Sequence, residues 1–566
     1  MSLSTPEIPE TKRRAWHGMS LRERIGQTCQ IHAGFMANWS DAEIRAYFAR
    51  NPVGGVFVGG EVIGPAEDKL AELKRRIALF QEASVVPLTV AGDLENGAGG
   101  AVRGLTAFPN LMALGAIDDV DVAYDYGRWT ALEATAVGFN WCLGPVADLS
   151  LNWLNPVVNL RAIGSDPAQT ACLLDALIRG MQDHGLSATA KHFPGDGVDF
   201  RDQHLCPGVN SLDADDWHRT FGAVFRRCIE TGVHAIMAGH IALPWADART
   251  NRAGVPIPAT VSKPLLTDLL RGELGFEGVV ASDALIMPGF TSWAAREQGL
   301  ITAFDAGVDV MLWPGDDYFE VMERAIERGL ISEERLNASV ERVLAMKALQ
   351  AKKTAELPVA TVTLGASNTE ALAYGRLIGE RSLTLLRNRR GVLPLNPKTV
   401  RRVCVLLATA REAERVQKIA GPLLERLRAR GCEVVVQVNG NCLDLVKREA
   451  AGEKFDALIA LFEQSIHAIK NTMRPGADLA ECMWMLQGLA TMEPIIVSLG
   501  SPYLLNDMPW AETCINAYGS SCFSLEALDA ALFGEIPFAG VCPVDAGGAW
   551  VMPTVGLEAS ALSSRL

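Results

Sequence analysis

The residue types best suited to acid–base chemistry gather in one segment, KHFPGDG at 191–197, which is followed by Asp202 and His204. Proline cannot donate to a strand ladder and glycine permits a turn, so a strand is predicted to end here, with Lys191 and His192 at its rim. Asp202 and His204 are two residues apart, and in an extended loop this spacing places both side chains on one side. The carboxylate could then orient the imidazole for proton transfer to and from a leaving group. A loop ion pair without a catalytic role fits the same spacing.

A second candidate is Asp283, which comes shortly after the apolar run at 278–280 and directly follows Ser282. A carboxylate after a buried strand is costly unless it is paired or functional, so Asp283 is a candidate nucleophile, with capping of the next helix as the alternative. Asp93 and His240 also end apolar runs, and Arg161 lies in the segment NLRAIGSD. Each of these three alone is more typical of a structural residue, but together they would supply donors and acceptors for hydroxyl groups. The remaining histidines lack ligand spacing, so no metal site is expected.

The elements that must position these residues alternate in type along the first 350 residues. Short apolar runs predict strands, and segments near 120–137, 168–185, 214–231 and 317–328 have the three- and four-residue apolar spacing of helices. This alternation predicts βαβ units around a parallel sheet, and seven or eight units favour a closed TIM-like (β/α)8 barrel over an open doubly wound sheet. The runs are 55–58, 87–93, 139–148, 187–193, 234–240, 278–284 and 308–314.

A second, smaller unit is expected after the barrel. Residues 1–350 are assigned to the catalytic barrel, 351–374 to a polar linker and 375–566 to a three-layer α/β sandwich domain with strands near 382–386, 403–407, 433–438, 456–462 and 494–499. Packing or dimerisation is the expected role of this second domain. A homodimer is one assembly that fits this role, and the sequence does not determine the oligomeric state.

Composition narrows the function classes. The chain has 566 residues and a formal net charge of −14, which argues against binding to nucleic acid or to an anionic membrane surface. The twelve cysteines include no Cys-x-x-Cys pair, which indicates free thiols in a reducing compartment. The N-terminal segment has no apolar core and no stretch reaches about 18 apolar residues, so a cytoplasmic protein without a membrane span is expected.

Taken together, the motifs resemble those of glycoside hydrolase family 3, in the family's order and over most of the chain. Besides KHFPGDG, the segments that carry the resemblance are LRERIGQ at 21, NPVGGVFVGG at 51, GDLENG at 92, GPVAD at 144, LRAIGSDP at 160, MAGHIALP at 237, GVVASDALIM at 278, AGVDVMLWPGD at 306, RSLTLLRNRRGVLPL at 381 and LFGEIPFAGVCPV ending at 544. Two departures stand out: Asp196 replaces the second histidine of the usual KHFPGHG, and Gln203 replaces the serine of the usual Asp-Ser-His.

The resemblance implies a retaining, exo-acting enzyme for β-linked sugars that needs no metal or organic cofactor. It assigns the nucleophile to Asp283 and the acid/base dyad to His204 with Asp202. Sugar contacts are implied at Asp93, Arg161, Lys191 and His192, and positions near the site at Met237 and His240. Retention requires the nucleophile and the acid to stand on opposite sides of the bond at short range.

The acceptor of the sugar is the open chemical question. A carboxylate acid/base, once ionised, repels phosphate, whereas a neutral histidine does not. The dyad branch of the family includes both β-N-acetylglucosaminidases and β-glycoside phosphorylases. The leading hypothesis is therefore transfer of β-linked glucose or N-acetylglucosamine to inorganic phosphate, which gives a sugar 1-phosphate. Hydrolysis by a β-N-acetylglucosaminidase/β-glucosidase is the alternative, and a sugar-binding pseudoenzyme is a third possibility.

Overall fold

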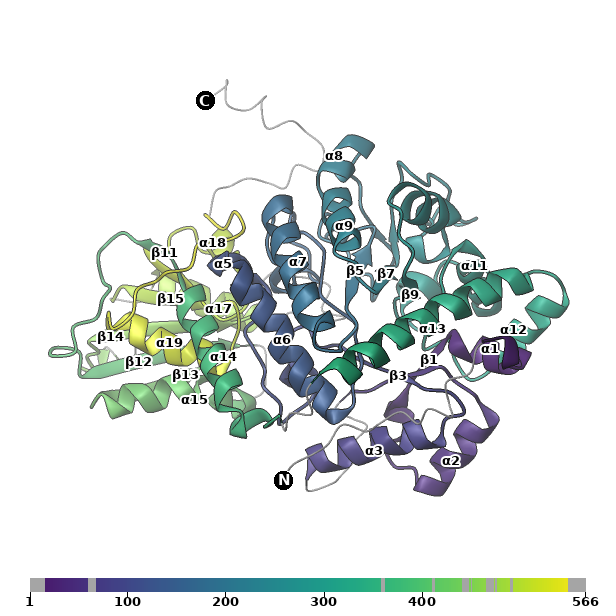
Figure 1. Cartoon of the computed structure of the whole chain (residues 1–566). Coiled ribbons are helices and arrows are strands. Elements are labelled where there is room, and N and C mark those ends of the chain that lie inside the picture. Colours follow the sequence, from purple (N-terminus) through teal and green to yellow (C-terminus); the bar gives the residue numbers. More distant parts are fainter. Residues whose placement is uncertain are drawn as a thin grey trace.

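The chain folds into two α/β units, which lie side by side in Figure 1. This computed structural model describes residues 16–59, 68–357, 362–409, 413–439, 447–448, 450–464, 473, 476–488 and 492–547. The N-terminal segment 1–15, on which the expectation of no leader depends, lies outside these ranges, as do residues 358–361 of the expected linker.

Eight parallel strands of the described residues close into the predicted barrel. They form a five-stranded sheet in the order β10-β1-β2-β3-β4 and a three-stranded sheet in the order β5-β7-β9. Bridges between Trp141 and Ser187 and between Ala281 and Val310 join the two sheets on both sides, so the ring has no open edge. The strands are β1 Cys29–His32, β2 Gly55–Phe57, β3 Thr89–Gly92, β4 Trp141–Cys142, β5 Thr189–Phe193, β7 Ala235–Ala238, β9 Val279–Ser282 and β10 Met311–Leu312.

Helices surround this barrel (Figure 1), and local sequence signals begin several of them. Ser20 and Ser40 each form a capping box with the glutamate three residues later, and Asp166 caps a helix whose first residue is proline. The helices are α1 Leu21–Gln27, α2 Asp41–Arg50, α3 Lys69–Ala83, α4 Ala98–Ala101, α5 Met112–Ile117, α6 Val120–Val137, α7 Pro167–Gln182, α8 Ala214–Arg219, α9 Phe221–Glu230, a π-helix Pro264–Glu273, α10 Pro288–Thr291, α11 Arg296–Ala306, α12 Tyr318–Glu327 and α13 Glu333–Glu356. The short strands β6 Gly208–Val209 and β8 Ile241–Ala242 pair outside the barrel.

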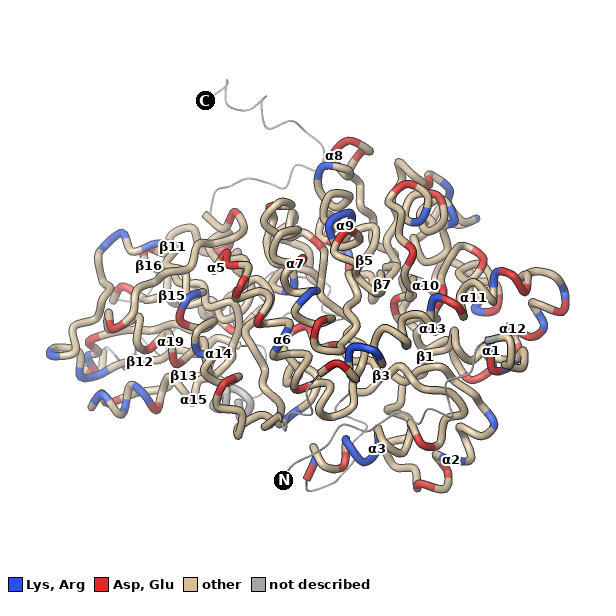
Figure 2. The backbone as a smooth tube through the Cα atoms, viewed as in Figure 1, with Lys and Arg blue, Asp and Glu red and all other residues tan. Residues whose placement is uncertain are grey.

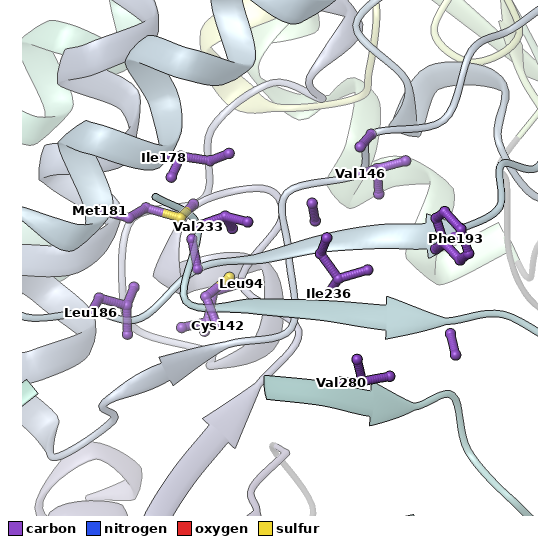
Figure 3. Close-up of a cluster of buried hydrophobic side chains, with 14 of the residues drawn as sticks. Leu94, Cys142, Val146, Ile178, Met181, Leu186, Phe193, Val233, Ile236 and Val280 are labelled. Atoms are coloured by element: carbon purple, nitrogen blue, oxygen red, sulfur yellow. The ribbon is translucent and has the colours of Figure 1, made fainter. Parts of the chain in front are cut away.

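Apolar side chains fill both faces of the barrel wall. On the outer face, Ile178 and Met181 of α7 pack toward Ile236 of β7, and Val280 of β9 belongs to the same buried cluster (Figure 3). Alternate strand residues point into the lumen, where Met237 and Ala281 pack with Trp141. The lumen is therefore a packed core, and only the strand ends are open for a site.

The second unit is the predicted three-layer sandwich. Its six-stranded sheet has the order β11-β16-β15-β14-β12-β13, with β11 antiparallel to β16 and the other pairs parallel. Alternate residues of β12 enter two separate cores: Val405 packs with α15 and α19, whereas Leu406 packs with α17. The elements are α14 Thr369–Ser382, β11 Thr384–Asn388, β12 Arg402–Thr409, α15 Ala413–Ala429, β13 Glu433–Val438, β14 Ala457–Glu463, α17 Ala477–Gly488, β15 Pro494–Ser498, α18 Leu504–Asp507, β16 Thr513–Asn516 and α19 Cys522–Leu532.

The expected linker 351–374 overlaps two helices, so the described residues leave a shorter connection than predicted. Helix α13 continues to Glu356 and α14 begins at Thr369. The end of α13 is polar but rich in Ala, Lys and Gln, which favour helix. Gln350 anchors this end by donating hydrogen bonds to the carbonyl of Asn140 and to Oγ of Ser187, both at 2.9 Å. The domain boundary itself stays a prediction.

Lys and Arg as well as Asp and Glu are scattered along the helices and loops of both units (Figure 2). Within the described ranges, every helix is too short or too polar to cross a bilayer.

Candidate active site

The predicted site residues gather at the carboxyl ends of the barrel strands. Because the strands are parallel, these ends share one mouth. Arg161 ends a short turn between β4 and α7, and Asp202 and His204 lie in the loop after β5. The other site residues are Asp93 after β3, Lys191 and His192 on β5, Met237 on β7, His240 after β7 and Asp283 after β9.

One side of the mouth is a network of buried charges around Glu95. Its carboxylate accepts two hydrogen bonds from Arg161, Nε to Oε2 at 2.9 Å and Nη2 to Oε1 at 2.8 Å. Lys191 Nζ lies 2.6 Å from the same Oε1 and 3.1 Å from Oδ1 of Asp93. Burial alone would raise the pKa of Glu95, but Arg161 and Lys191 outweigh it and hold that pKa well below its usual range.

This network presents polar groups to the mouth. Burial alone would lower the pKa of Lys191, but Asp93 and Glu95 raise it above its ordinary value, so the ammonium stays charged. The Asp93 side chain is 54% exposed, whereas that of Lys191 is 4% exposed. The half-exposed carboxylate is therefore held by a buried cation, an arrangement suited to hydrogen bonding with sugar hydroxyl groups.

His192 is oriented by a carboxylate beneath it. Asp148 is fully buried, and its Oδ2 lies 2.7 Å from Nδ1 of His192, which donates to it. The backbone amides of His192 and Asp196 both donate to Asp148 Oδ1, at 3.1 and 2.7 Å. This leaves Nε2 of His192 as the nitrogen not used by Asp148.

Asp196, the departure from the usual family motif, is buried beside this pair. Its Oδ1 accepts hydrogen bonds from Asn155 and from the amide of Gly197, whereas its buried Oδ2 has no hydrogen-bond partner among the described residues. Burial and the neighbouring Asp148 raise the pKa of Asp196 to about 7, although His192 lowers it in part. A carboxyl held partly protonated near neutral pH thus occupies the place expected for a histidine.

Asp202 and His204 make the contact that their spacing predicts. Oδ1 of the fully buried Asp202 lies 2.7 Å from Nδ1 of His204 and also accepts the His204 amide at 2.8 Å. The imidazole is therefore held with Nε2 directed away from Asp202, and its side chain is 25% exposed. Gln203 ties this loop to the barrel, because its Oε1 accepts the amide of His240 at 3.0 Å and its carbonyl accepts the amide of Gly289 at 3.2 Å.

Asp283 is an ionised carboxylate at the end of β9. Its Oδ1 accepts the amide of Ala284 at 2.7 Å. Burial alone would raise the pKa of Asp283, but His192, His240, this amide and, more weakly, Lys191 outweigh it and keep the pKa below its ordinary value. A carboxylate that stays ionised is the form required of a nucleophile.

His240 supports the site rather than facing it. Its Nδ1 hydrogen-bonds with Thr260 Oγ1 at 2.8 Å, its Nε2 donates to the carbonyl of Ala284 at 3.0 Å, and the residue is fully buried. His240 therefore has no free ring nitrogen and no exposed surface with which to make the substrate contact expected from the sequence. Burial lowers the pKa of His240, and the neighbouring Asp283 opposes that change in part.

Sequence reasoning missed two residues of this site. Glu95 and Asp148 were not assigned a role, although Glu95 lies in the motif GDLENG and Asp148 ends a predicted strand. Glu95 is 66 residues from Arg161, and Asp148 is 44 residues from His192. The available signals were the motif GDLENG for Glu95 and the position at the end of a predicted strand for Asp148.

A closed eight-stranded barrel whose mouth combines an ionised aspartate, a histidine–aspartate pair and a lysine–arginine–carboxylate network is typical of enzymes that act on polyhydroxylated substrates. Within the described ranges, His, Cys, Asp and Glu side chains form no group of three or more that could hold a metal ion. Residues 20–346 match the family described as "Glycosyl hydrolase family 3 N terminal domain", and the chain belongs to this family.

Relatives align over nearly the whole chain. A β-N-acetylglucosaminidase/β-glucosidase from Cellulomonas fimi is 35% identical over 530 residues, which cover 90% of this chain and 91% of that protein. The structure of the β-glucoside phosphorylase BglX bound to 2FGlc has a TM-score of 0.82 and 26% identity, with 97% and 99% of the two chains covered. A family 3 β-N-acetylglucosaminidase from Paenibacillus sp. str. FPU-7 has a TM-score of 0.80 and 28% identity, with 94% and 99% covered.

Proposed function

We propose that the protein is a retaining, exo-acting β-glycosidase that removes terminal β-linked N-acetylglucosamine or glucose, with Asp283 as the nucleophile. The observation that carries this proposal is that His240 bridges the two reactive loops. Its Nε2 holds the carbonyl of Ala284, next to Asp283, and its amide holds Gln203, next to His204. One buried residue thus contacts both the loop that carries Asp283, through its side chain, and the loop that carries His204, through its backbone amide.

We infer the first chemical step from the proposed roles. The Asp283 carboxylate attacks the anomeric carbon while the protonated imidazole of His204 gives its Nε2 proton to the glycosidic oxygen. The bond to the leaving group breaks, and an ester between the sugar and Asp283 forms. Asp202 stabilises the imidazolium before the transfer, and Asp93, Arg161, Lys191 and His192 are proposed to bind the sugar hydroxyl groups.

In the second step, the neutral imidazole of His204 takes a proton from a water molecule that attacks the same carbon. The ester breaks, Asp283 is released as a carboxylate, and two inversions at the anomeric carbon retain its configuration. The named activity of the Cellulomonas fimi relative favours this hydrolytic route over the phosphorylase hypothesis that leads from the sequence alone.

Phosphate is the second candidate acceptor, and the dyad is the observation that favours it. After the first step the acid/base is an uncharged imidazole, so no carboxylate acid/base repels an approaching phosphate. The likeness to the BglX phosphorylase supports the same route. In that case phosphate attacks the glycosyl ester and leaves with the sugar as a sugar 1-phosphate.

Two comparisons test these proposals. The enzyme is incubated with an aryl β-N-acetylglucosaminide and with the matching aryl β-glucoside, each with and without inorganic phosphate, and the sugar products are identified. Free sugar of retained configuration at a rate independent of phosphate supports hydrolysis. Faster turnover with phosphate, together with sugar 1-phosphate, replaces it by phosphorolysis. Absence of turnover of both glycosides under both conditions contradicts the proposed function.

A further inference from the structure

Two segments of the second unit contact barrel loops that carry residues of the candidate active site. The segments follow β15 and β16, which are neighbouring parallel strands, so both segments leave the same edge of the sheet. Their contacts with the barrel loops are hydrogen bonds between buried groups. The proposed mechanism assigns no role to any residue of this second unit.

Tyr503, after β15, makes the first contact. Its hydroxyl donates to the carbonyl of Ser150 at 3.0 Å and lies 2.8 Å from the Ser150 hydroxyl. Tyr503 is 4% exposed and Ser150 is 3% exposed, so water cannot replace a lost hydrogen bond easily. Ser150 lies two residues after Asp148, the carboxylate that orients His192. Tyr503 therefore holds the chain beside the partner of a proposed sugar contact.

Ser501, two residues before Tyr503, makes the second contact. Its Oγ accepts a hydrogen bond from Nδ2 of Asn159 at 3.3 Å, and both residues are buried. Asn159 has a φ of 36°, which is uncommon for a residue other than glycine and persists where the surroundings fix it. Asn159 begins the short turn that ends at Arg161. Ser501 therefore holds the turn from which Arg161 reaches Glu95.

The third contact runs through an additional side chain. The carbonyl of Tyr518, after β16, accepts Nδ2 of Asn110 at 2.9 Å, and Oδ1 of Asn110 accepts Nδ2 of Asn96 at 2.7 Å. Asn96 directly follows Glu95. All three contacts thus reach the barrel within two residues of a buried charged group of the site.

The loop that joins β4 to α7, residues 143–166, depends on such contacts. All its residues are described, and apart from the turn Asn159–Arg161 it contains no helix or strand. Within the loop, the amide of Ser150 donates to the carbonyl of Gly164 at 3.0 Å. A loop this long has many accessible conformations, whereas groups that bind a substrate must be held within about 0.5 Å. Contacts from outside the loop are needed to select one conformation.

We propose that Tyr503 and Ser501 are positioning residues for sugar binding. They hold the 143–166 loop so that Arg161 and the pair of Asp148 and His192 keep their places at the barrel mouth. The inference rests on the proposed function, which assigns sugar contacts to Arg161 and His192. The second unit thereby acts on the substrate through the loop, without touching it.

Tyr503→Phe removes the hydroxyl group and keeps the ring, and Tyr374→Phe is the matched control. Tyr374 is also buried, and its hydroxyl also crosses between the units, but it donates to the carbonyl of Val122 in helix α6 and not to a loop of the mouth. Both variants are compared with the wild type on the aryl β-glycoside that the enzyme turns over better. Thermal unfolding checks that each variant folds.

Y503F is expected to raise KM by about fivefold or more while kcat changes by less than about threefold, because Asp283 and His204 lie outside the 143–166 loop. S501A should act in the same direction, and it decides the test if Y503F does not fold. Y374F should lower the unfolding temperature as much as Y503F but leave KM within about twofold of the wild type. An equal rise of KM in Y503F and Y374F, or a loss in kcat alone, overturns the inference and leaves the proposed function intact.

Amide hydrogen exchange of the full chain gives a readout that does not depend on turnover. Y503F and S501A should speed exchange in peptides that cover residues 148–164, because local opening of the loop becomes easier, whereas Y374F should not. Unchanged exchange there in both variants overturns the inference. If the wild type turns over no glycoside, the proposed function is refuted, and the exchange still decides whether the second unit holds the loop.

Discussion

Replacing Glu95 by glutamine removes the charge at the centre of the Arg161–Lys191 network while keeping the shape of the side chain. The Glu95 and Arg161 side chains are only 12% and 22% exposed, and that of Lys191 is 4% exposed. Breaking a buried ion pair from one side costs about 3–5 kcal/mol, because the partner charge stays buried. Lys191 keeps Asp93 at 3.1 Å, so we expect the lower end of that range for E95Q, about 3 kcal/mol in the free energy of unfolding.

The loss of stability caused by E95Q should become smaller at low pH. The folded pKa of Glu95 is lowered, so its stabilisation is fully present above the unfolded pKa of about 4.3 and is lost as the pH falls toward the folded value. The free energy of unfolding is measured by chemical denaturation. The difference in this free energy between wild type and E95Q should therefore reach its full size at pH 7 and be smaller below about pH 4. Relaxation of Arg161 and Lys191 should also raise KM, by about tenfold if one hydrogen bond to a charged group is lost.

Glu297→Gln is the control for Glu95→Gln. Glu297 pairs with Arg324 at 3.2 Å, but the two side chains are 50% and 42% exposed, so the loss should stay below about 1 kcal/mol. If E95Q destabilises the protein no more than E297Q does, the network around Glu95 does not hold the site together and the reasoning is wrong.

Three further predictions concern the catalytic roles of Asp283 and His204 and the protonation of Asp196. D283N should lower kcat on the order of a thousandfold or more without changing the unfolding temperature by more than a few degrees, and full residual activity would mean that the nucleophile lies elsewhere. H204A should lower kcat by about 10²–10⁴-fold, with a smaller loss for substrates whose leaving group needs no proton; equal losses for all leaving groups would exclude an acid role. Because the pKa of Asp196 is raised to about 7, from about 3.9 when unfolded, the native state holds an extra proton and stability should fall between about pH 4 and pH 7. D196N should remove this decline, so its stability relative to wild type should rise from pH 5 to pH 8; a pH-independent difference in chemical denaturation would contradict the shift.

Much of the fold was predictable because its signals are local. The runs that precede Asp93 and Asp283 form β3 and β9, and the helical spacing at 120–137 is α6. Strand β1 escaped detection because it has little apolar pattern: Cys29–His32 includes Gln30, which is fully buried and accepts a hydrogen bond from Thr89 at 2.8 Å. A buried polar residue whose hydrogen bond comes from a neighbouring strand has the sequence pattern of a loop.

The dyad and the nucleophile position were also readable from the chain itself. Residue type and spacing predict the contact between Asp202 and His204, which the structure contains, and the position of Asp283 after a strand. The catalytic roles of these residues are implied by the family resemblance and stay predictions. Only the tertiary structure brings Glu95 to Arg161 and Asp148 to His192, because the barrel closes those contacts between distant strands. It also turns both ring nitrogens of His240 inward. Hydrogen-bond partners of a buried side chain depend on which strands become neighbours, and that is decided when the ring closes and not by any one segment.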